Sequence, residues 1–286
     1  MIAPAEARVV QPGSIKRPTD RVAELQKTIS ASRLTTWLQC RLKFYFRYIV
    51  ELPKAPTPSM HAGSTVHAVL QQWNLARWRR EPFRLERFEA LFGSQWTALQ
   101  NGVKIRWEGE EESERLAAWS TLEHYLSATP IRPDEKPEAV EVRVEADLSR
   151  HGLPTLVGVL DVVRSGGRIV DFKVVGKSPH QENLSHVHEV QLTCYSVLYR
   201  DATAKKEVGL ELHHLVKTKA PKLIVSSLPP STEQQHTRLF RQIKSYQAGL
   251  ERRDFVPSPG LHCHSCEFIN ECRAWCGKEV YGETVP

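Results

Sequence analysis

The sequence predicts an α/β protein, because segments with strand periodicity alternate with segments of helical periodicity. Two groups of alternating apolar residues are typical of strands, and amphipathic segments lie before, between and after them. The resulting order of helix, three strands, helix, two strands and helix indicates an α/β fold with a large helical insert before the sheet. The expected strands cover residues 138–148, 155–164, 168–175, 208–216 and 222–228.

The N-terminal part is expected to contain a loosely ordered segment, one helix and a linker. Residues 1–29 hold several prolines and a glycine without clear periodicity. Ser30 or Ser32 is placed to cap an amphipathic helix that reaches Tyr45. Three prolines within residues 51–60 then indicate a linker.

The helical insert is expected to cover about residues 64–130. Gly63 and Ser64 precede its first apolar stripe, and prolines close it. Within it, residues 81–129 have a composition typical of continuous helix. Two more helices are expected in the sheet core, over residues 184–200 and from a Ser231 cap to about residue 253.

Composition narrows the class of protein. The chain has 286 residues, of which 41% are apolar and 25% charged, as in ordinary globular proteins. Its net charge of +6 favours an anionic partner. The N-terminus shows no apolar leader and no run has membrane-spanning length, so a cytoplasmic protein without a membrane partner is expected. Six cysteines in such a compartment are more typical of thiols or metal ligands than of disulfides.

A predicted hairpin around a Gly-Gly turn carries the strongest chemical signal. It places Asp161 on one strand, and Asp171 and Lys173 on the next, with an acid at the end of each strand. Asp171 and Lys173 are two residues apart, so their side chains leave the same face. Two carboxylates and an ammonium group suit a hard cation that activates water against a phosphodiester. A single Asp near a turn is more often a solvated structural residue, but Glu141 on the preceding strand adds a further carboxylate.

Three residues outside the hairpin are candidates for the same site. Gln191 and Tyr195 lie four apart on a predicted helix and therefore share one face, although each alone is compatible with a plain surface position. His67 is expected in the first turn of the helix that Gly63 opens. There the positive end of the helix dipole would lower the imidazole pKa and keep a nitrogen free for metal.

These residues form four motifs that resemble the RecB-type exonucleases of the PD-(D/E)xK nuclease superfamily. The resemblance spans residues 30–276 and implies a restriction-endonuclease-like core, a central mixed sheet flanked by helices, with sheet core about 138–253 and a tail at 277–286. Val174 departs from the family pattern, which usually has a small polar residue there. In chain order, the motifs are Gly63-x3-His67, Gly158-x2-Asp161, Asp171-Phe172-Lys173 and Gln191-x3-Tyr195.

The resemblance also implies roles for the site residues. His67, Asp161, Asp171 and the backbone carbonyl of Phe172 would hold Mg²⁺ or Mn²⁺. Lys173 would position or activate the attacking water; among carboxylates it stays charged, which favours electrostatic stabilisation over general-base catalysis. Gln191 and Tyr195 would orient the site or contact DNA.

The C-terminal cysteines indicate a metal or cluster site. The spacing Cys263-x2-Cys266-x5-Cys272-x3-Cys276 suits a tetrahedral zinc site, or three ligands of an iron–sulfur cluster with one distant cysteine, and the residues alone leave both open. The resemblance extends to relatives with an iron–sulfur clasp, among them the AddB nuclease domain and CRISPR-associated exonucleases. It implies a 4Fe–4S cluster held by Cys40, Cys263, Cys266 and Cys272, with Zn²⁺ at residues 263–276 as the alternative.

Cations and aromatic residues alternate beside Cys40, and such a stretch could follow phosphates and stack unpaired bases. Equally, the aromatic residues could be core and the cations a solvated face. The candidate nucleic-acid contacts are Arg41, Lys43, Tyr45 and Arg47.

Taken with the resemblance, the expected function is that of a Mg²⁺- or Mn²⁺-dependent DNA exonuclease that prefers single-stranded ends, in recombination, repair or DNA processing. No Walker A motif is present, so any motor would be a separate helicase, and recombination or CRISPR-adaptation proteins are further candidate partners. The alternatives are a CRISPR-associated nuclease that trims DNA before spacer integration, a DNA-end-binding module that does not cut, and a zinc-stabilised scaffold.

Overall fold

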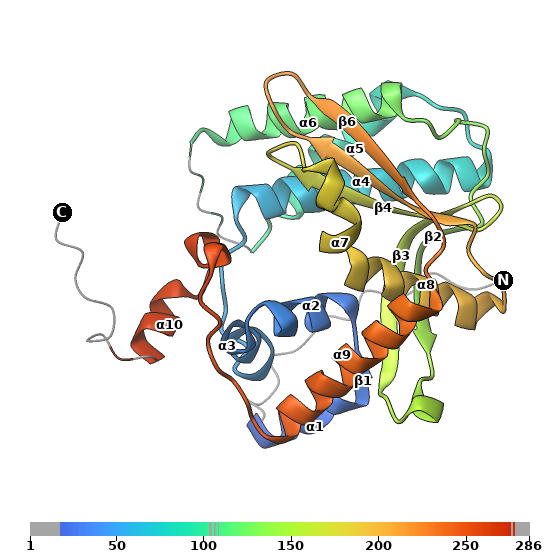
Figure 1. The fold of residues 1–286 in the computed structure, drawn as a ribbon. Helices are drawn as coiled ribbons and strands as arrows, with labels where there is room; N and C mark the ends of the chain where they lie inside the picture. Colours follow the sequence, from blue (N-terminus) through green and yellow to red (C-terminus); the bar gives the residue numbers. More distant parts are fainter. Residues whose placement is uncertain (1–17, 103–104, 106, 108, 276, 278–286) are drawn as a thin grey trace.

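A six-stranded mixed sheet lies between two layers of helices in the computed structural model, which describes residues 18–102, 105, 107, 109–275 and 277 (Figure 1). The strands are β1 (Thr28–Ile29), β2 (Ala139–Ala146), β3 (Thr155–Arg164), β4 (Arg168–Val175), β5 (Gly209–Val216) and β6 (Lys222–Leu228). The helices are α1 (Pro18–Lys27), α2 (Ala31–Gln39), α3 (Arg41–Phe44), α4 (Pro58–Arg79), α5 (Leu85–Ala98), α6 (Glu111–Ala128), α7 (Leu184–Val187), α8 (Glu189–Thr203), α9 (Glu233–Glu251) and α10 (Ile269–Trp275).

Strand β3 is the centre of the sheet. Strand β2 pairs antiparallel with one edge of β3 along almost its whole length. The other edge is shared, because β1 runs parallel to its start and β4 runs antiparallel to its end. Strands β5 and β6 extend the sheet beyond β4. The mixed α/β core that the sequence predicts is therefore confirmed, including all five strands expected from residue 138 onward.

Each face of the sheet has its own apolar core. Helices α2, α8 and α9 cover one face, where Trp37, Leu198 and Tyr246 are buried with residues of β3 and β5. Helices α4, α5 and α6 cover the other face, where Trp73 and Phe92 belong to the buried cluster. Figure 1 shows the two helical layers on opposite sides of the strands.

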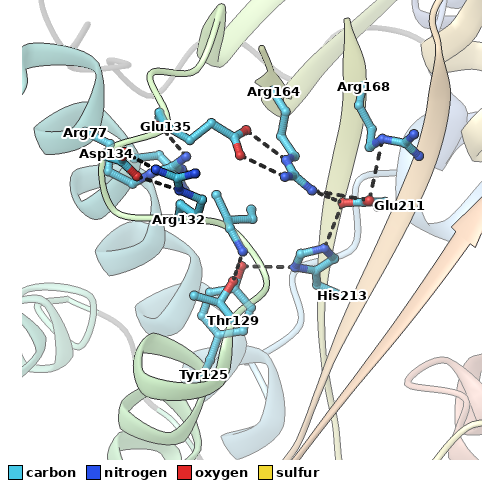
Figure 2. A network of polar contacts seen from close by, with 12 residues as sticks. Arg77, Tyr125, Thr129, Arg132, Asp134, Glu135, Arg164, Arg168, Glu211 and His213 are labelled. Atoms are coloured by element: carbon cyan, nitrogen blue, oxygen red, sulfur yellow. Dashed lines mark hydrogen bonds and ion pairs between the residues drawn. The ribbon is translucent and has the colours of Figure 1, made fainter. Parts of the chain in front are cut away.

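A buried ionic network joins the α4–α6 layer to the sheet (Figure 2). Arg164 on β3 makes two hydrogen bonds to Glu135, which precedes β2, and reaches Glu211 on β5 at 3.0 Å. Glu211 also contacts His213 at 3.2 Å, and His213 lies 3.0 Å from the hydroxyl of Tyr125 on α6. Arg77 on α4 donates to the carbonyl of Glu135 at 2.7 Å. The helical insert is thus fixed to the sheet by polar contacts as well as by apolar packing.

Several expected helix boundaries were wrong. Helix α4 begins at Pro58, with Thr57 as its N-cap, because the Thr57 side chain accepts from Met60 N and proline suits the first helical positions. Helix α9 is capped by Thr232 rather than Ser231, in a capping box with Gln235.

Other expectations about the N-terminal half also need correction. The described part of residues 1–29, from Pro18 on, forms α1 and β1 instead of a loose lead-in, since β1 pairs with β3. The stretch 81–129 is interrupted between α5 and α6.

No helix among the described residues has the length and apolar character needed to cross a membrane.

Candidate active site

In the strand that carries Asp161, the alternation of side chains between the two faces of the sheet is broken at that residue. Leu160 belongs to the core under α8, whereas Val162, two positions on, belongs to the core under α4. The flanking register places Glu141 of β2 opposite Asp161, and Glu141 has a φ of 47°, a left-handed conformation that is costly for a residue with a side chain. Both strands are therefore distorted at the same level.

From Asp161 toward the start of β3, this strand no longer pairs with β4. Their ladder covers only Val162 to Arg164 and its partners, and the next rung is replaced by a hydrogen bond from Phe172 N to Asp161 Oδ2, at 3.0 Å. The carboxylate of Asp161 is thereby fixed by the backbone of β4 in the opening between the strands. Both acids lie within their strands, not at the strand ends that the sequence suggested.

The second carboxylate is the centre of a polar cluster between β4 and α8. Asp171 Oδ1 accepts from Gln191 Nε2 at 3.0 Å and from the Tyr195 hydroxyl at 3.2 Å. Lys173 Nζ donates to Gln191 Oε1 at 2.8 Å and forms an ion pair with Asp171 Oδ2 at 2.9 Å. That ion pair lacks hydrogen-bond geometry, so Asp171 Oδ2 is buried without a hydrogen-bond partner. The structure brings these four predicted residues together.

His67 adjoins the same opening from α4. Its Nδ1 lies 3.8 Å from Asp161 Oδ2, and its side chain is 38% exposed. Because α4 starts at Pro58, His67 lies in the middle of the helix, so the expected effect of the helix dipole was wrong. Burial is instead the main cause that lowers its pKa, and the imidazole is held in the neutral form that can donate a lone pair to a metal.

The electrostatics of the carboxylates favour a cation between them. Burial, followed by repulsion from Asp171, raises the pKa of Asp161 to about 7. Within the described part of the chain, no three His, Cys, Asp or Glu side chains are already arranged around one point as metal ligands. The donor chemistry nevertheless fits a hard divalent ion, because it combines two carboxylates, a buried oxygen without a hydrogen bond and a neutral imidazole.

Comparison with known proteins identifies the family of the chain. Residues 28–273 match the family model described as the PD-(D/E)XK nuclease superfamily. The chain belongs to this superfamily. No curated protein matches the sequence of this nuclease.

Solved structures resemble the nuclease at low sequence identity. A protein from Eubacterium rectale, provisionally described as an exonuclease, has a TM-score of 0.61 at 12% identity, over 88% of this chain and 90% of that chain. This likeness concerns the fold. A second structure, of the protein SSO0001, has a TM-score of 0.42 at 13% identity, over 90% and 94% of the two chains, which is too weak to bear on the fold.

A second candidate site in the nuclease lies where α2 meets α3. A cavity of about 220 Å³ is lined by Cys40, Cys263, Cys266 and Cys272, with Phe46 and Phe268 among its apolar walls. Cys40 Sγ accepts from Lys43 N at 3.5 Å, and Cys263 Sγ accepts from Gly260 N at 3.4 Å. One N-terminal and three C-terminal cysteines therefore line the same cavity, although among the described residues no three of their thiols are placed to hold one metal ion. Cys276, the fourth residue of the zinc alternative, lies outside the described residues, and Cys194 is buried in α8 as expected.

The basic stretch beside Cys40 is engaged within the chain. Arg41 pairs with Asp254, whereas Lys43 and Arg47 both pair with Glu267. Tyr45 packs on Phe255 and Trp275. These contacts attach the C-terminal segment to α3, and the use of Arg41, Lys43, Tyr45 and Arg47 for nucleic acid stays a prediction.

Two histidines next to the site were missed from the sequence. His214 on β5 is the register partner of Lys173, and the ring of His188 lies 5.7 Å from that of His214. A helical signal for His188 was present, because residues 188, 191 and 195 follow the spacing of one helix face. His214 had no such signal, since only the strand pairing places it beside Lys173.

Proposed function

We propose that this nuclease is a Mg²⁺- or Mn²⁺-dependent exonuclease that hydrolyses DNA, with a preference for single-stranded ends, in recombination, repair or DNA processing. The observation that carries the proposal is the pair of facing carboxylates, Asp161 and Asp171, with Lys173 bound beside them. Acids that repel each other across an opening, next to a fixed ammonium group, suit metal-assisted attack of water on a phosphodiester.

Asp161, Asp171, His67 and the carbonyl of Phe172 would hold the divalent ion. When bound, such an ion polarises the scissile phosphate and lowers the pKa of its water ligand. Asp161 must release its proton to act as a ligand, so its raised pKa makes metal affinity increase with pH through about 7. The backbone N–H of Phe172 keeps the Asp161 carboxylate pointed into the opening.

The remaining polar residues orient and stabilise. Lys173 Nζ, held by Gln191 Oε1, supplies positive charge where the pentacoordinate phosphate develops negative charge. Gln191 also donates to Asp171, so its amide sets the positions of both the Lys173 ammonium group and the Asp171 carboxylate. Burial and the charge of Asp171 raise the pKa of Tyr195, which therefore stays protonated and donates to that carboxylate.

Exonuclease action and DNA as substrate are supported by the family resemblance and by the fold neighbour from Eubacterium rectale, which carries a provisional exonuclease description. The test uses purified full-length protein with end-labelled single- and double-stranded DNA, in Mg²⁺ or Mn²⁺. We expect shortening from an end of single strands in the wild type, and loss of at least 100-fold of the rate in Asp171→Ala and Lys173→Ala. Asp201→Asn, an exposed acid on α8, is the control.

Two outcomes would contradict this assignment. Cleavage that survives both substitutions would exclude the proposed centre. Tight DNA-end binding without cleavage in either metal would favour the non-cutting end-binding module.

The four thiols around the 220 Å³ cavity support a 4Fe–4S cluster as the second cofactor, with a structural role. Thiolates are the usual ligands of such clusters, and the two N–H···S contacts are of the kind that tune them. A bound cluster would tie α2 to the C-terminal segment and close a very long loop.

An anaerobic preparation should be brown and contain about four iron atoms per chain, as expected for this cluster type. Cys40→Ser should lose iron, whereas Cys194→Ser should retain it. A colourless protein with one zinc per chain that is insensitive to Cys40→Ser would instead favour the zinc alternative at residues 263–276.

A further inference from the structure

The polar contacts between the sheet and α8 form successive layers that lead out of the core. Tyr195 contacts Asp171 in the first layer, and Gln191 contacts Lys173 in the second. His188, the N-cap residue of α8, comes next along the chain toward the start of the helix. His214 lies beside Lys173 in the sheet, and the ring centroids of the two histidines are 5.7 Å apart. Deeper along α8 the same interface is apolar, so the polar residues gather at one end of it.

His214 is an unusual residue for its position. It is 1% exposed on a strand in which every residue is buried, and its Nδ1 has no hydrogen-bond partner. The adjacent His213 provides a comparison, because it faces the opposite side of the sheet, where its ring nitrogens contact Tyr125 and Glu211. A buried polar atom without a partner costs stability, which is a reason to look for a partner that arrives with a ligand.

Both imidazoles are kept neutral. Burial is the main cause that lowers the pKa of His214 to about 4, and the positive charge of Lys173 acts in the same direction. Burial and Lys173 also lower the pKa of His188. A neutral imidazole still has one N–H to donate, and His188 is only half-buried at the N-cap position of α8. The two imidazoles of His188 and His214 therefore offer hydrogen-bond donors beside the Lys173 ammonium group without adding a second fixed charge.

We propose that His188 and His214 form a subsite for the phosphodiester that neighbours the scissile one, with His188 as the contact and His214 as the positioning residue behind it. Adjacent strands lie about 4.8 Å apart, and His214 is the register partner of Lys173, so the subsite begins one strand spacing to the side of Lys173. Phosphate oxygens are strong acceptors for N–H groups. The inference rests on the proposed function and specifies how the same site grips its substrate.

The test measures binding and turnover separately. Binding of a labelled single-stranded oligonucleotide is followed by fluorescence anisotropy in Ca²⁺, and cleavage is followed in Mn²⁺. His188→Ala should weaken binding by about tenfold, the loss expected for one hydrogen bond to a charged group, and raise KM with little change in kcat.

Three further measurements separate the subsite from mere packing. His214→Leu should leave the melting temperature unchanged or raised, since it removes an unpaired buried nitrogen, yet weaken binding in the direction of His188→Ala. His214→Asn, which keeps a polar group near the Nδ1 position, should restore part of the affinity. A methylphosphonate at the neighbouring linkage should weaken binding to the wild type but not weaken binding to His188→Ala further.

The inference is overturned if the wild type cleaves DNA while His188→Ala and His214→Leu bind the oligonucleotide and turn it over as the wild type does. It is also overturned if the methylphosphonate weakens binding equally in wild type and His188→Ala. A wild type that neither binds nor cuts DNA would instead overturn the proposed function itself.

Discussion

Asp161 replaces a rung of the β-ladder with its own side chain, because its Oδ2 accepts the hydrogen bond of Phe172 N at 3.0 Å where β3 and β4 cease to pair. A strand opening needs another acceptor for the freed N–H, and here the acceptor is the residue that faces a second carboxylate. The same contact that stabilises the opening therefore orients the site.

Asp161→Asn should stabilise the metal-free protein at alkaline pH. The folded state keeps the Asp161 proton up to about pH 7, whereas the unfolded chain releases it near 4, so the free energy of unfolding falls as pH rises between these values. Asparagine retains an acceptor for Phe172 N and removes the repulsion with Asp171. Urea unfolding in a chelator at pH 8 should show a gain on the order of 1–3 kcal/mol.

Two controls accompany the Asp161 measurement. At pH 4 the difference between wild type and Asp161→Asn should nearly vanish. Addition of Mn²⁺ at pH 8 should stabilise the wild type but not the variant, because ligand binding to the folded state adds stability only where the site is intact. A variant that is less stable than the wild type at pH 8 without metal would contradict the electrostatic account.

Gln191→Ala should reduce turnover more than it reduces stability. The amide connects Lys173, Asp171 and Tyr195, so its loss frees the ammonium group and leaves the carboxylate with one fewer donor. We expect kcat to fall by about 10- to 100-fold with KM little changed, since positioning acts on the transition state. Gln234→Ala, an exposed position on α9, should have no effect in the same steady-state assay. An equal loss in both variants would exclude the positioning role.

Arg164→Ala should strongly destabilise the join between the helical insert and the sheet. Burial would raise the pKa of Glu211, but contacts from His213 and Arg164 lower it, so the carboxylate stays charged inside the network (Figure 2). Removal of the arginine leaves that charge and Glu135 without their main partner, at a cost of about 3 kcal/mol.

Arg168→Ala is the matched comparison, because Arg168 also reaches Glu211 but only at 3.6 Å and from a more exposed position. Its loss should cost less than about 1 kcal/mol in the free energy of unfolding. Chemical denaturation of both variants checks the pair, and equal losses would argue against a dominant role for Arg164.

The sequence was sufficient for the five strands from residue 138 onward, but not for β1 or for the distortion at Asp161. Apolar alternation and the Gly-Gly turn placed β3 and β4 within a residue or two, and the two-residue spacing placed Asp171 and Lys173 on one face. No local pattern shows that β3 changes faces at Asp161, because that change depends on Glu141 across the ladder. Local signals thus predict elements, and cross-strand geometry decides where the acids point.

The contacts of His214 and of the basic stretch also depend on residues that are distant in the sequence. His214 reaches Lys173 only through the parallel pairing of β4 with β5, which no spacing along the chain encodes. Conversely, Arg41 and Arg47 pair with acidic residues more than 200 positions away, which the local alternation of cations and aromatic residues does not show. Their use for nucleic acid stays a prediction. Long-range partners cannot be assigned from a single sequence when opposite charges occur throughout it.

Gly249→Ala should destabilise the contact between α9 and α2 although alanine is the better helix former. A Cβ at this position would lie 2.2 Å from Cζ2 of Trp37, and that indole is held in place by Phe44 and Tyr246. Relief would require the helices to separate, at a cost of about 1–3 kcal/mol, as in other overpacked cores. Gly93→Ala in α5, where nothing lies within 4 Å of the added carbon, should instead gain up to about 1 kcal/mol from helix propensity. Thermal and urea unfolding of the two variants should show a loss of stability for Gly249→Ala and a gain for Gly93→Ala if close packing against Trp37 decides the effect at Gly249. A gain in stability in both variants would show that α9 shifts freely on α2.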